Sequence, residues 1–150
     1  MLKIILVLVL YFVSLTSFAQ MASTPNTEKK SKTKHQIKVV INNIAPNNGS
    51  VYFALYDSES NFDKRNPLNS QSIPVTNGIA NISFEEVEAG VYAITCFYDA
   101  NNNGRMDFQS NGMPIEDYGA TNNVMNFGPP QFQDAKFELT DKDLTFEIKF

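Results

Sequence analysis

The chain has 150 residues, of which 43% are hydrophobic, and a formal net charge of −4 at pH 7. From residue 37 onward the balance is more acidic, because seven lysines and arginines stand against fifteen aspartates and glutamates. An acidic domain attracts cations and repels phosphate groups, so this composition argues against nucleic acid as a partner. The single cysteine excludes an internal disulfide, and stability must come from core packing and from any bound metal.

The first 19 residues have the pattern of a secretory signal peptide. Lys3 precedes an apolar run over residues 4–13, and the small residues Ser17 and Ala19 stand where a signal peptidase requires them. We therefore expect cleavage after Ala19 and an exported chain, periplasmic or secreted. The alternative is an uncleaved anchor, but the run is shorter than the roughly 20 apolar residues of a membrane span. We expect no membrane span after cleavage.

Residues 20–36 have no periodic apolar pattern and are rich in Ser, Thr, Lys and Pro, which predicts a flexible linker. Four lysines gather within residues 29–34, but no interleaved aromatic residues accompany them, so a nucleic-acid patch is not indicated. The only histidine, His35, falls in this linker. Residues 37–150 have the length of one domain, which we expect to be monomeric.

Alternation of apolar and polar residues dominates the domain and predicts β-strands. Ile37, Val39 and Ile41 share one face of the first strand, and the turn residues at 46–49 predict a hairpin to the second. The expected strands are residues 37–41, 51–55, 71–76, 79–84, 91–98, 135–139 and 144–150. About seven short strands predict an all-β sandwich of the immunoglobulin or prealbumin type, with one long ordered loop.

Residues 91–98 are apolar on both faces, which indicates a central strand. Ile94 and Cys96 lie on the same side of it, so we expect Cys96 to be a buried and unreactive thiol. A tight turn is expected at residues 76–78, where Thr, Asn and Gly follow one another.

Two segments break the strand pattern, residues 57–70 and residues 99–134. Irregular loops of this length are uncommon in compact domains and are usually functional or disordered. The second segment is rich in Tyr, Phe, Met and Pro, so we expect it to be ordered.

The second segment opens with regularly spaced oxygen-bearing side chains. Residues 99–107 read D-x-N-x-N-G-x-x-D, with oxygen side chains at positions 1, 3, 5 and 9 and glycine at position 6. Calcium takes six to eight oxygen ligands, and a chain turning around the ion offers alternate side chains and the carbonyl of position 7. The expected calcium ligands are Asp99, Asn101, Asn103, Asp107 and the carbonyl oxygen of Arg105, whose side chain is expected to point away.

The loop is not an EF-hand, because a strand precedes it and position 12 is Ser110 instead of glutamate. The missing carboxylate is expected from Glu116 or Asp117, after the chain folds back at residues 112–114. With few carboxylates, calcium would bind at about 10⁻⁴ to 10⁻³ M. The alternative is a turn in which Asp and Asn side chains cap their own backbone without metal.

No catalytic set emerges from the sequence. A nucleophilic triad has no histidine base within the predicted domain. Asp107 and Glu116 are a carboxylate pair that could act on a glycosidic bond, but nothing in the sequence places them around a substrate. We therefore expect a protein that is not an enzyme.

Several separated motifs carry a resemblance to a known family. They are Gly90-Val91-Tyr92-Ala93-Ile94, Phe97-Tyr98-Asp99, the loop at 101–107, and the segments 112–119 and 128–137. With these motifs in order, residues 37–150 resemble the bacterial family called domain of unknown function 2141. The resemblance implies an exported β-sandwich and no particular activity. The Asp-Asn-Gly loop is also similar to calcium loops in B-type repeats of bacterial surface adhesins, where calcium rigidifies a sandwich.

Together these features predict an exported, non-catalytic module, stabilised by calcium and serving a binding or structural role toward an extracellular or periplasmic ligand of unknown identity. A carbohydrate- or peptide-binding module is the alternative, with Tyr118, Phe127 and Phe132 as stacking platforms. An acid–base hydrolase is the third hypothesis, and it would require paired carboxyl groups facing a cleft.

Overall fold

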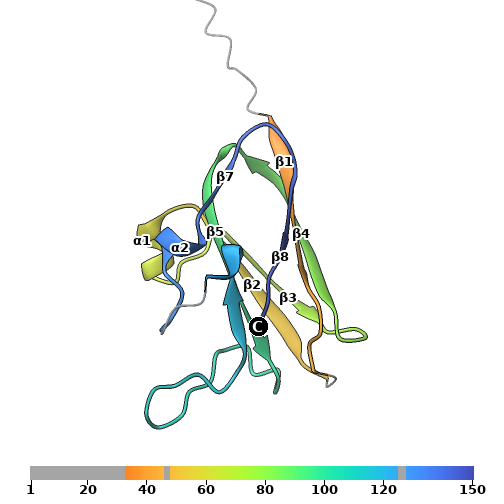
Figure 1. Ribbon diagram of the computed structural model, residues 1–150, viewed down its shortest axis with the longest axis vertical. Coiled ribbons are helices and arrows are strands. Elements are labelled where there is room, and N and C mark those ends of the chain that lie inside the picture. Colours follow the sequence, from red (N-terminus) through yellow and green to blue (C-terminus); the bar gives the residue numbers. More distant parts are fainter. Residues whose placement is uncertain (1–32, 46–47, 125–127) are drawn as a thin grey trace, which may run out of the picture. The chain divides into compact units, whose positions relative to one another are not determined.

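The computed structural model describes residues 33–45, 48–124 and 128–150, which contain two β-sheets (Figure 1). The elements in chain order are β1 (Lys34–Ile41), β2 (Ser50–Tyr56), α1 (Glu59–Asp63), β3 (Asn69–Pro74), β4 (Ala80–Glu88), β5 (Gly90–Asp99), β6 (Tyr118–Ala120), η1 (Thr121–Asn123), α2 (Phe132–Ala135), β7 (Phe137–Leu139) and β8 (Leu144–Glu147). The predicted all-β sandwich is confirmed. No helix in the described part of the chain is long and apolar enough to cross a membrane.

The first sheet has the order β4-β1-β8, with β1 antiparallel to β4 and parallel to β8. Strand β1 begins at Lys34, three residues before the expected start of the domain. Its first residues pair with the end of β4, where His35 lies opposite Val87. Residues 34–36 therefore belong to the sandwich, and His35 is buried instead of lying in a solvated linker.

The second sheet has the order β3-β2-β5-β6, and β7 also pairs with the first residues of β5. The prediction that residues 91–98 form a central strand is confirmed, since β5 pairs with β2 on one edge and with β6 and β7 on the other. Both faces of β5 are apolar because one faces the core and the other is partly covered. Ala93 packs on the outer face with Phe132 and Ala135 of α2.

The predicted hairpin between the first two strands is wrong, because β1 and β2 lie in different sheets. The chain crosses between the sheets after Ile41, where Asn43 adopts a positive φ of 62°. The amide of Ile44 then donates to the carbonyl of Gly78 at 3.0 Å. The tight turn at residues 76–78 is confirmed, with positive φ at Asn77 and Gly78 and backbone hydrogen bonds between Thr76 and Ile79.

The core lies between the two sheets. Alternate residues of β1 and β4 meet those of β2 and β5 there, and Phe53 and Phe84 are fully buried. Each such side chain contributes about 1.5–3 kcal/mol by leaving water. Cys96 belongs to this cluster with Ile94 on the same face, so its predicted inward position is confirmed.

Both segments that broke the strand pattern are ordered where they are described. Residues 57–70 contain α1, whose first turn is capped by the Ser58 hydroxyl accepting from the Asn61 amide. Residues 99–134 contain β6 and η1, which the sequence did not reveal, and most of α2. The expected strand at 135–139 is shorter than predicted, because Ala135 ends α2 and β7 begins at Phe137.

Candidate functional site

The predicted calcium loop begins where β5 ends, and its two ends are held together. Asp99 pairs with Ser50 of β2, and the neighbouring Tyr98 amide donates to the carbonyl of Asp117 at 2.8 Å. Gly49 permits the close approach of β2, since a Cβ there would lie 2.7 Å from the Asp99 carbonyl oxygen. The stem of the loop is thus fixed by strand pairing.

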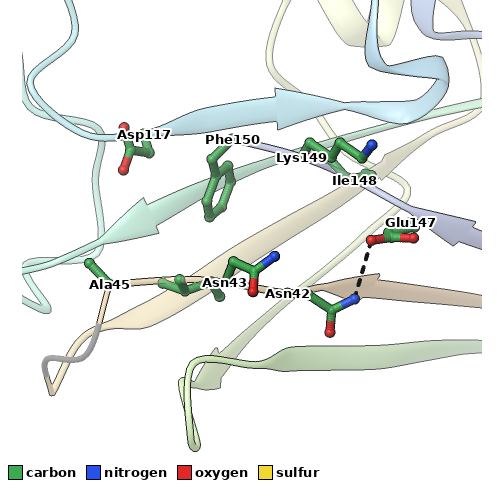
Figure 2. A pocket seen from close by; sticks show the side chains of 9 residues that line it. Asn42, Asn43, Ala45, Asp117, Glu147, Ile148, Lys149 and Phe150 are labelled. Atoms are coloured by element: carbon green, nitrogen blue, oxygen red, sulfur yellow. Dashed lines mark hydrogen bonds between the residues drawn. The ribbon is translucent and has the colours of Figure 1, made fainter.

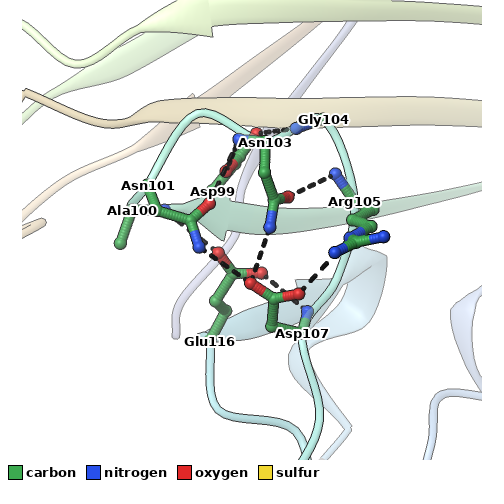
Figure 3. A network of polar contacts seen from close by, with 8 residues as sticks. All are labelled: Asp99, Ala100, Asn101, Asn103, Gly104, Arg105, Asp107 and Glu116. Atoms are coloured by element: carbon green, nitrogen blue, oxygen red, sulfur yellow. Dashed lines mark hydrogen bonds and ion pairs between the residues drawn. The ribbon is translucent and has the colours of Figure 1, made fainter.

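The carboxylate of Asp99 is the centre around which the loop winds (Figure 3). Its side chain lies inside the turn, and the residue is only 4% exposed. Its two oxygens accept from the amides of Asn103 at 3.0 Å and Gly104 at 2.7 Å. Gly104 has a φ of +78°, a conformation that costs glycine little and other residues more.

Asn101 and Asn103 repeat one hydrogen-bonding pattern. The side-chain oxygen of each accepts the backbone amide two residues ahead, at 3.1 Å from Asn103 and 3.0 Å from Arg105. Their NH₂ groups both donate to one carboxylate oxygen of Asp107, at 2.8 Å and 2.7 Å. Asp107 therefore accepts hydrogen bonds from the side-chain nitrogens of the two asparagines, while their side-chain oxygens accept from backbone amides.

A small backbone hairpin brings the chain back to the loop, as expected from the turn residues at 112–114. The Gln109 amide donates to the Met113 carbonyl at 2.8 Å, and the Ile115 amide donates to the Asp107 carbonyl at 2.9 Å. This ladder places the next residue, Glu116, beside the first turn of the loop.

Glu116 connects the two halves of the loop. It is 8% exposed, and its two carboxylate oxygens accept from the amides of Ala100 at 3.2 Å and Asp107 at 3.1 Å. Of the two acidic residues considered for the missing carboxylate, Glu116 thus reaches the loop, whereas Asp117 is exposed.

Arg105 is the basic residue that pairs with the carboxylates of the loop. Its side chain is 78% exposed, and its Nε lies 3.6 Å from an Asp107 oxygen. The expectation that this side chain points away is therefore wrong, because the charge of Asp107 attracts it. Hydrogen bonds from Asn101 and Asn103, together with the charge of Arg105, lower the pKa of Asp107.

The observed hydrogen bonds are those of a turn that caps its own backbone. They still leave lone pairs on the carboxylate oxygens that could coordinate a cation. A carboxylate oxygen or an amide oxygen has two lone pairs, and each oxygen of Asp99 and Glu116 is seen to accept one amide. Within the described residues no three His, Cys, Asp or Glu side chains gather as a metal cluster. Convergence of the expected ligands on one ion stays a prediction.

The aromatic residues of the alternative hypothesis are less open than expected. Phe132 is buried and packs edge-on against Phe62, with ring centroids 5.8 Å apart. Tyr118 is half-buried, and its hydroxyl donates to the Gly128 carbonyl at 3.4 Å. Phe127 lies outside the described residues. The buried position of Phe132 and the half-buried position of Tyr118 weaken the idea of a stacking platform in this loop.

His35 is the residue that sequence reasoning misplaced. Its imidazole is buried in β1, with Nδ1 3.8 Å from a carboxylate oxygen of Asp143. The signal was present, since His35 continues the alternate spacing of Ile37, Val39 and Ile41 toward the N-terminus.

Comparison with known proteins gives one result. The family model described as an uncharacterized protein conserved in bacteria (DUF2141) matches residues 39–147, most of the chain. The chain belongs to this family. The searches of curated proteins and of solved structures gave no match. The loop from Asp99 to Glu116 lies within the range that the DUF2141 model matches.

Proposed function

We propose that this DUF2141 protein is an exported, non-catalytic sandwich module whose loop at 99–116 takes a calcium ion, which fixes the loop for a binding or structural role. The observation that carries the proposal is the position of Glu116, a buried carboxylate that accepts the backbone amides of Ala100 and Asp107 within the loop. Residues 99–116 carry three carboxylates, those of Asp99, Asp107 and Glu116, and Arg105 is the one basic residue among them. A cation would relieve this excess of negative charge.

The chemistry of the donor set favours calcium over transition metals. The candidate ligands are carboxylate, amide and carbonyl oxygens, and hard oxygen donors select calcium or magnesium. Calcium tolerates irregular geometry and six to eight ligands, as an irregular loop supplies, while magnesium demands a near-ideal octahedron.

Binding would reorganise one part of the loop. The NH₂ groups of Asn101 and Asn103 now contact Asp107, so a cation would displace these contacts and take Asp107 as a direct ligand. The amide bonds to Asp99 and Glu116 need not break, because each bonded oxygen keeps a second lone pair. This partial reorganisation supports weak binding, in the range of about 10⁻⁴ to 10⁻³ M.

Export is supported by the pattern of the first 19 residues, which lie outside the described residues. Calcium sites of extracellular modules have dissociation constants in this weak range of about 10⁻⁴ to 10⁻³ M. A non-catalytic role is supported by the engagement of the buried Glu116 carboxylate, both oxygens of which accept backbone amides.

Thermal melting with calcium and with chelator tests the proposal. An ion that binds only the folded state stabilises it by about 1.4 kcal/mol at ten times Kd, which raises the melting temperature by a few degrees in a domain of this size. Asp99→Ala lowers the starting stability because two amides lose their acceptor, so the increment produced by calcium is the relevant quantity. We expect that increment to vanish in Asp99→Ala.

Asp57→Ala is the matched control, because Asp57 is also a carboxylate that accepts local hydrogen bonds, from Ser58 and Asn61. Its variant should keep the full calcium increment. If millimolar calcium shifts the melting temperature of neither the parent nor the variants, the loop is a self-capped turn and the proposal fails.

A further inference from the structure

One concave feature of the surface is not lined by the buried carboxylates Asp99 and Glu116. Where β1 and β8 end, the surface forms a pocket of about 470 Å³ (Figure 2). Its lining residues are Asn42, Asn43, Ile44, Ala45, Asp117, Glu147, Ile148, Lys149 and Phe150. The volume is in the range of small-molecule sites, about 300–1,000 Å³.

The walls of this pocket are held by hydrogen bonds to other elements. The side chain of Asn123 in η1 clamps one wall, donating to the Glu147 carbonyl and accepting from the Lys149 amide, both at 2.8 Å. On the opposite wall the Ile44 amide donates to the Gly78 carbonyl at 3.0 Å. A ligand would therefore meet a pre-formed shape, which reduces the entropy cost of binding.

The charges of the lining argue against a strongly charged ligand. Asp117 and Glu147 are anionic and would repel an anion, while Lys149 would repel a cation. Asn42 donates to the Glu147 carboxylate at 3.3 Å, which offsets part of that negative charge. The lining nevertheless offers both donors and acceptors, and a hydroxyl group uses both.

One aromatic residue completes the lining. Phe150 is 40% exposed, and its ring points from the last residues of the chain toward the segment that carries Asn43 (Figure 2). An exposed ring provides apolar area that a ligand can cover, and the exposed Ala45 adds to it. The lining thus combines an apolar platform with amide and carboxylate groups.

We propose that this pocket binds a neutral saccharide, with one apolar face of the sugar ring on Phe150 and its hydroxyl groups bonded to Asn43, Asp117 and Glu147. This binding activity goes beyond the calcium loop and does not depend on it. None of the residues is among the aromatics first considered for carbohydrate binding.

The test is a titration of the full chain with the methyl glycosides of glucose, galactose and mannose and with N-acetylglucosamine, followed by amide NMR signals. At least one of these sugars should shift the signals of residues 42–45 and 147–150. Phe150→Ala should weaken its binding by about tenfold. Phe108→Ala is the matched control, since Phe108 is similarly exposed at 47% but lies in the hairpin of the loop; it should leave binding unchanged.

Glu147→Gln supplies a second variant whose side chain keeps its size while losing the charge, and it should weaken the same sugar. Charged analogues of the same ring test the charge argument: cationic glucosamine and anionic glucuronate should bind no better than N-acetylglucosamine. Preferred binding of glucosamine would overturn the saccharide proposal in favour of a cation site. Absence of shifts at these residues with all four neutral sugars at high millimolar concentration would also overturn it.

Discussion

At the scale of single residues, Glu116 is the side chain that bonds the start of the loop to its later part. Its carboxylate accepts two amides that are seven residues apart in sequence, those of Ala100 and Asp107, while buried from water. Glu116→Ala should lower the free energy of unfolding by about 1–3 kcal/mol, because the amides lose a charged acceptor. Urea denaturation measures this difference.

The neighbouring Asp117 gives the matched control for that variant. Its side chain is exposed, and its contact with Tyr98 uses the backbone carbonyl, which alanine keeps. Asp117→Ala should change the free energy of unfolding by no more than about 0.5 kcal/mol. Equal losses in the two variants would show that the bonds of Glu116 do not stabilise the loop.

The ionisation of Asp107 makes the stability of the loop depend on pH. The pKa of Asp107 is lowered chiefly by the hydrogen bond from Asn101, so the ionised form gains stability from folding. That contribution is fully present above the unfolded-state pKa and is lost as the pH falls through the lowered folded-state pKa. Asn101→Ala should raise the pKa of Asp107, measured by NMR titration of its carboxyl carbon. Asn111→Ala, which removes a bond to Met113 only, should leave that pKa as it was.

The reactivity of the Cys96 thiol gives a test of the packing of the core. Burial raises the pKa of this thiol strongly, and the sulfur contacts the Gly119 carbonyl at 3.6 Å. The folded protein should therefore resist a thiol reagent that labels the same residue rapidly after denaturation. Rapid labelling under native conditions would place Cys96 outside the core.

At the scale of elements, Gly119 controls how β6 meets the segment after β8. A Cβ at Gly119 would lie 2.7 Å from the Lys149 carbonyl oxygen and equally close to a methyl group of Ile148. Gly119→Ala should destabilise the protein by about 1–3 kcal/mol through overpacking, seen as a lower urea midpoint. Ser72→Ala, on an exposed position of edge strand β3, is the control and should have little effect. A neutral Gly119→Ala would mean that the two segments can separate freely.

The strands and loops also show which parts of the fold could be predicted from the sequence. Alternation identified the strands because an apolar face must be buried, but a period of two residues does not specify the partner strand. The turn residues at 46–49 suggested a hairpin, whereas β1 pairs with β4 and β8. Strand β6 has three residues, too few for a visible alternation. The loop at 99–107 was found from its spacing, and capping by its own Asp and Asn side chains was one of the two expectations. The bonds from the amides of Ala100 and Asp107 to Glu116 were not foreseen, because they depend on the chain folding back.

At the scale of the whole molecule, the acidic net charge and the carboxylates of the loop both favour a cation as ligand. The domain carries more carboxylates than basic groups, and the buried carboxylates of its described residues, Asp99 and Glu116, both lie in the loop to which we assign a cation. Membership of DUF2141 places this loop inside a bacterial family domain. The central claim is that calcium binds at this one place and not diffusely over the acidic surface.

Titration of the protein with calcium, followed residue by residue through its amide NMR signals, tests that claim most directly. The account predicts saturable shifts confined to residues 99–107 and to Glu116, with a Kd of about 10⁻⁴ to 10⁻³ M, while signals of residues 42–45 and 147–150 stay in place. Shifts scattered over the acidic surface without saturation, or no shifts in the loop, would contradict it.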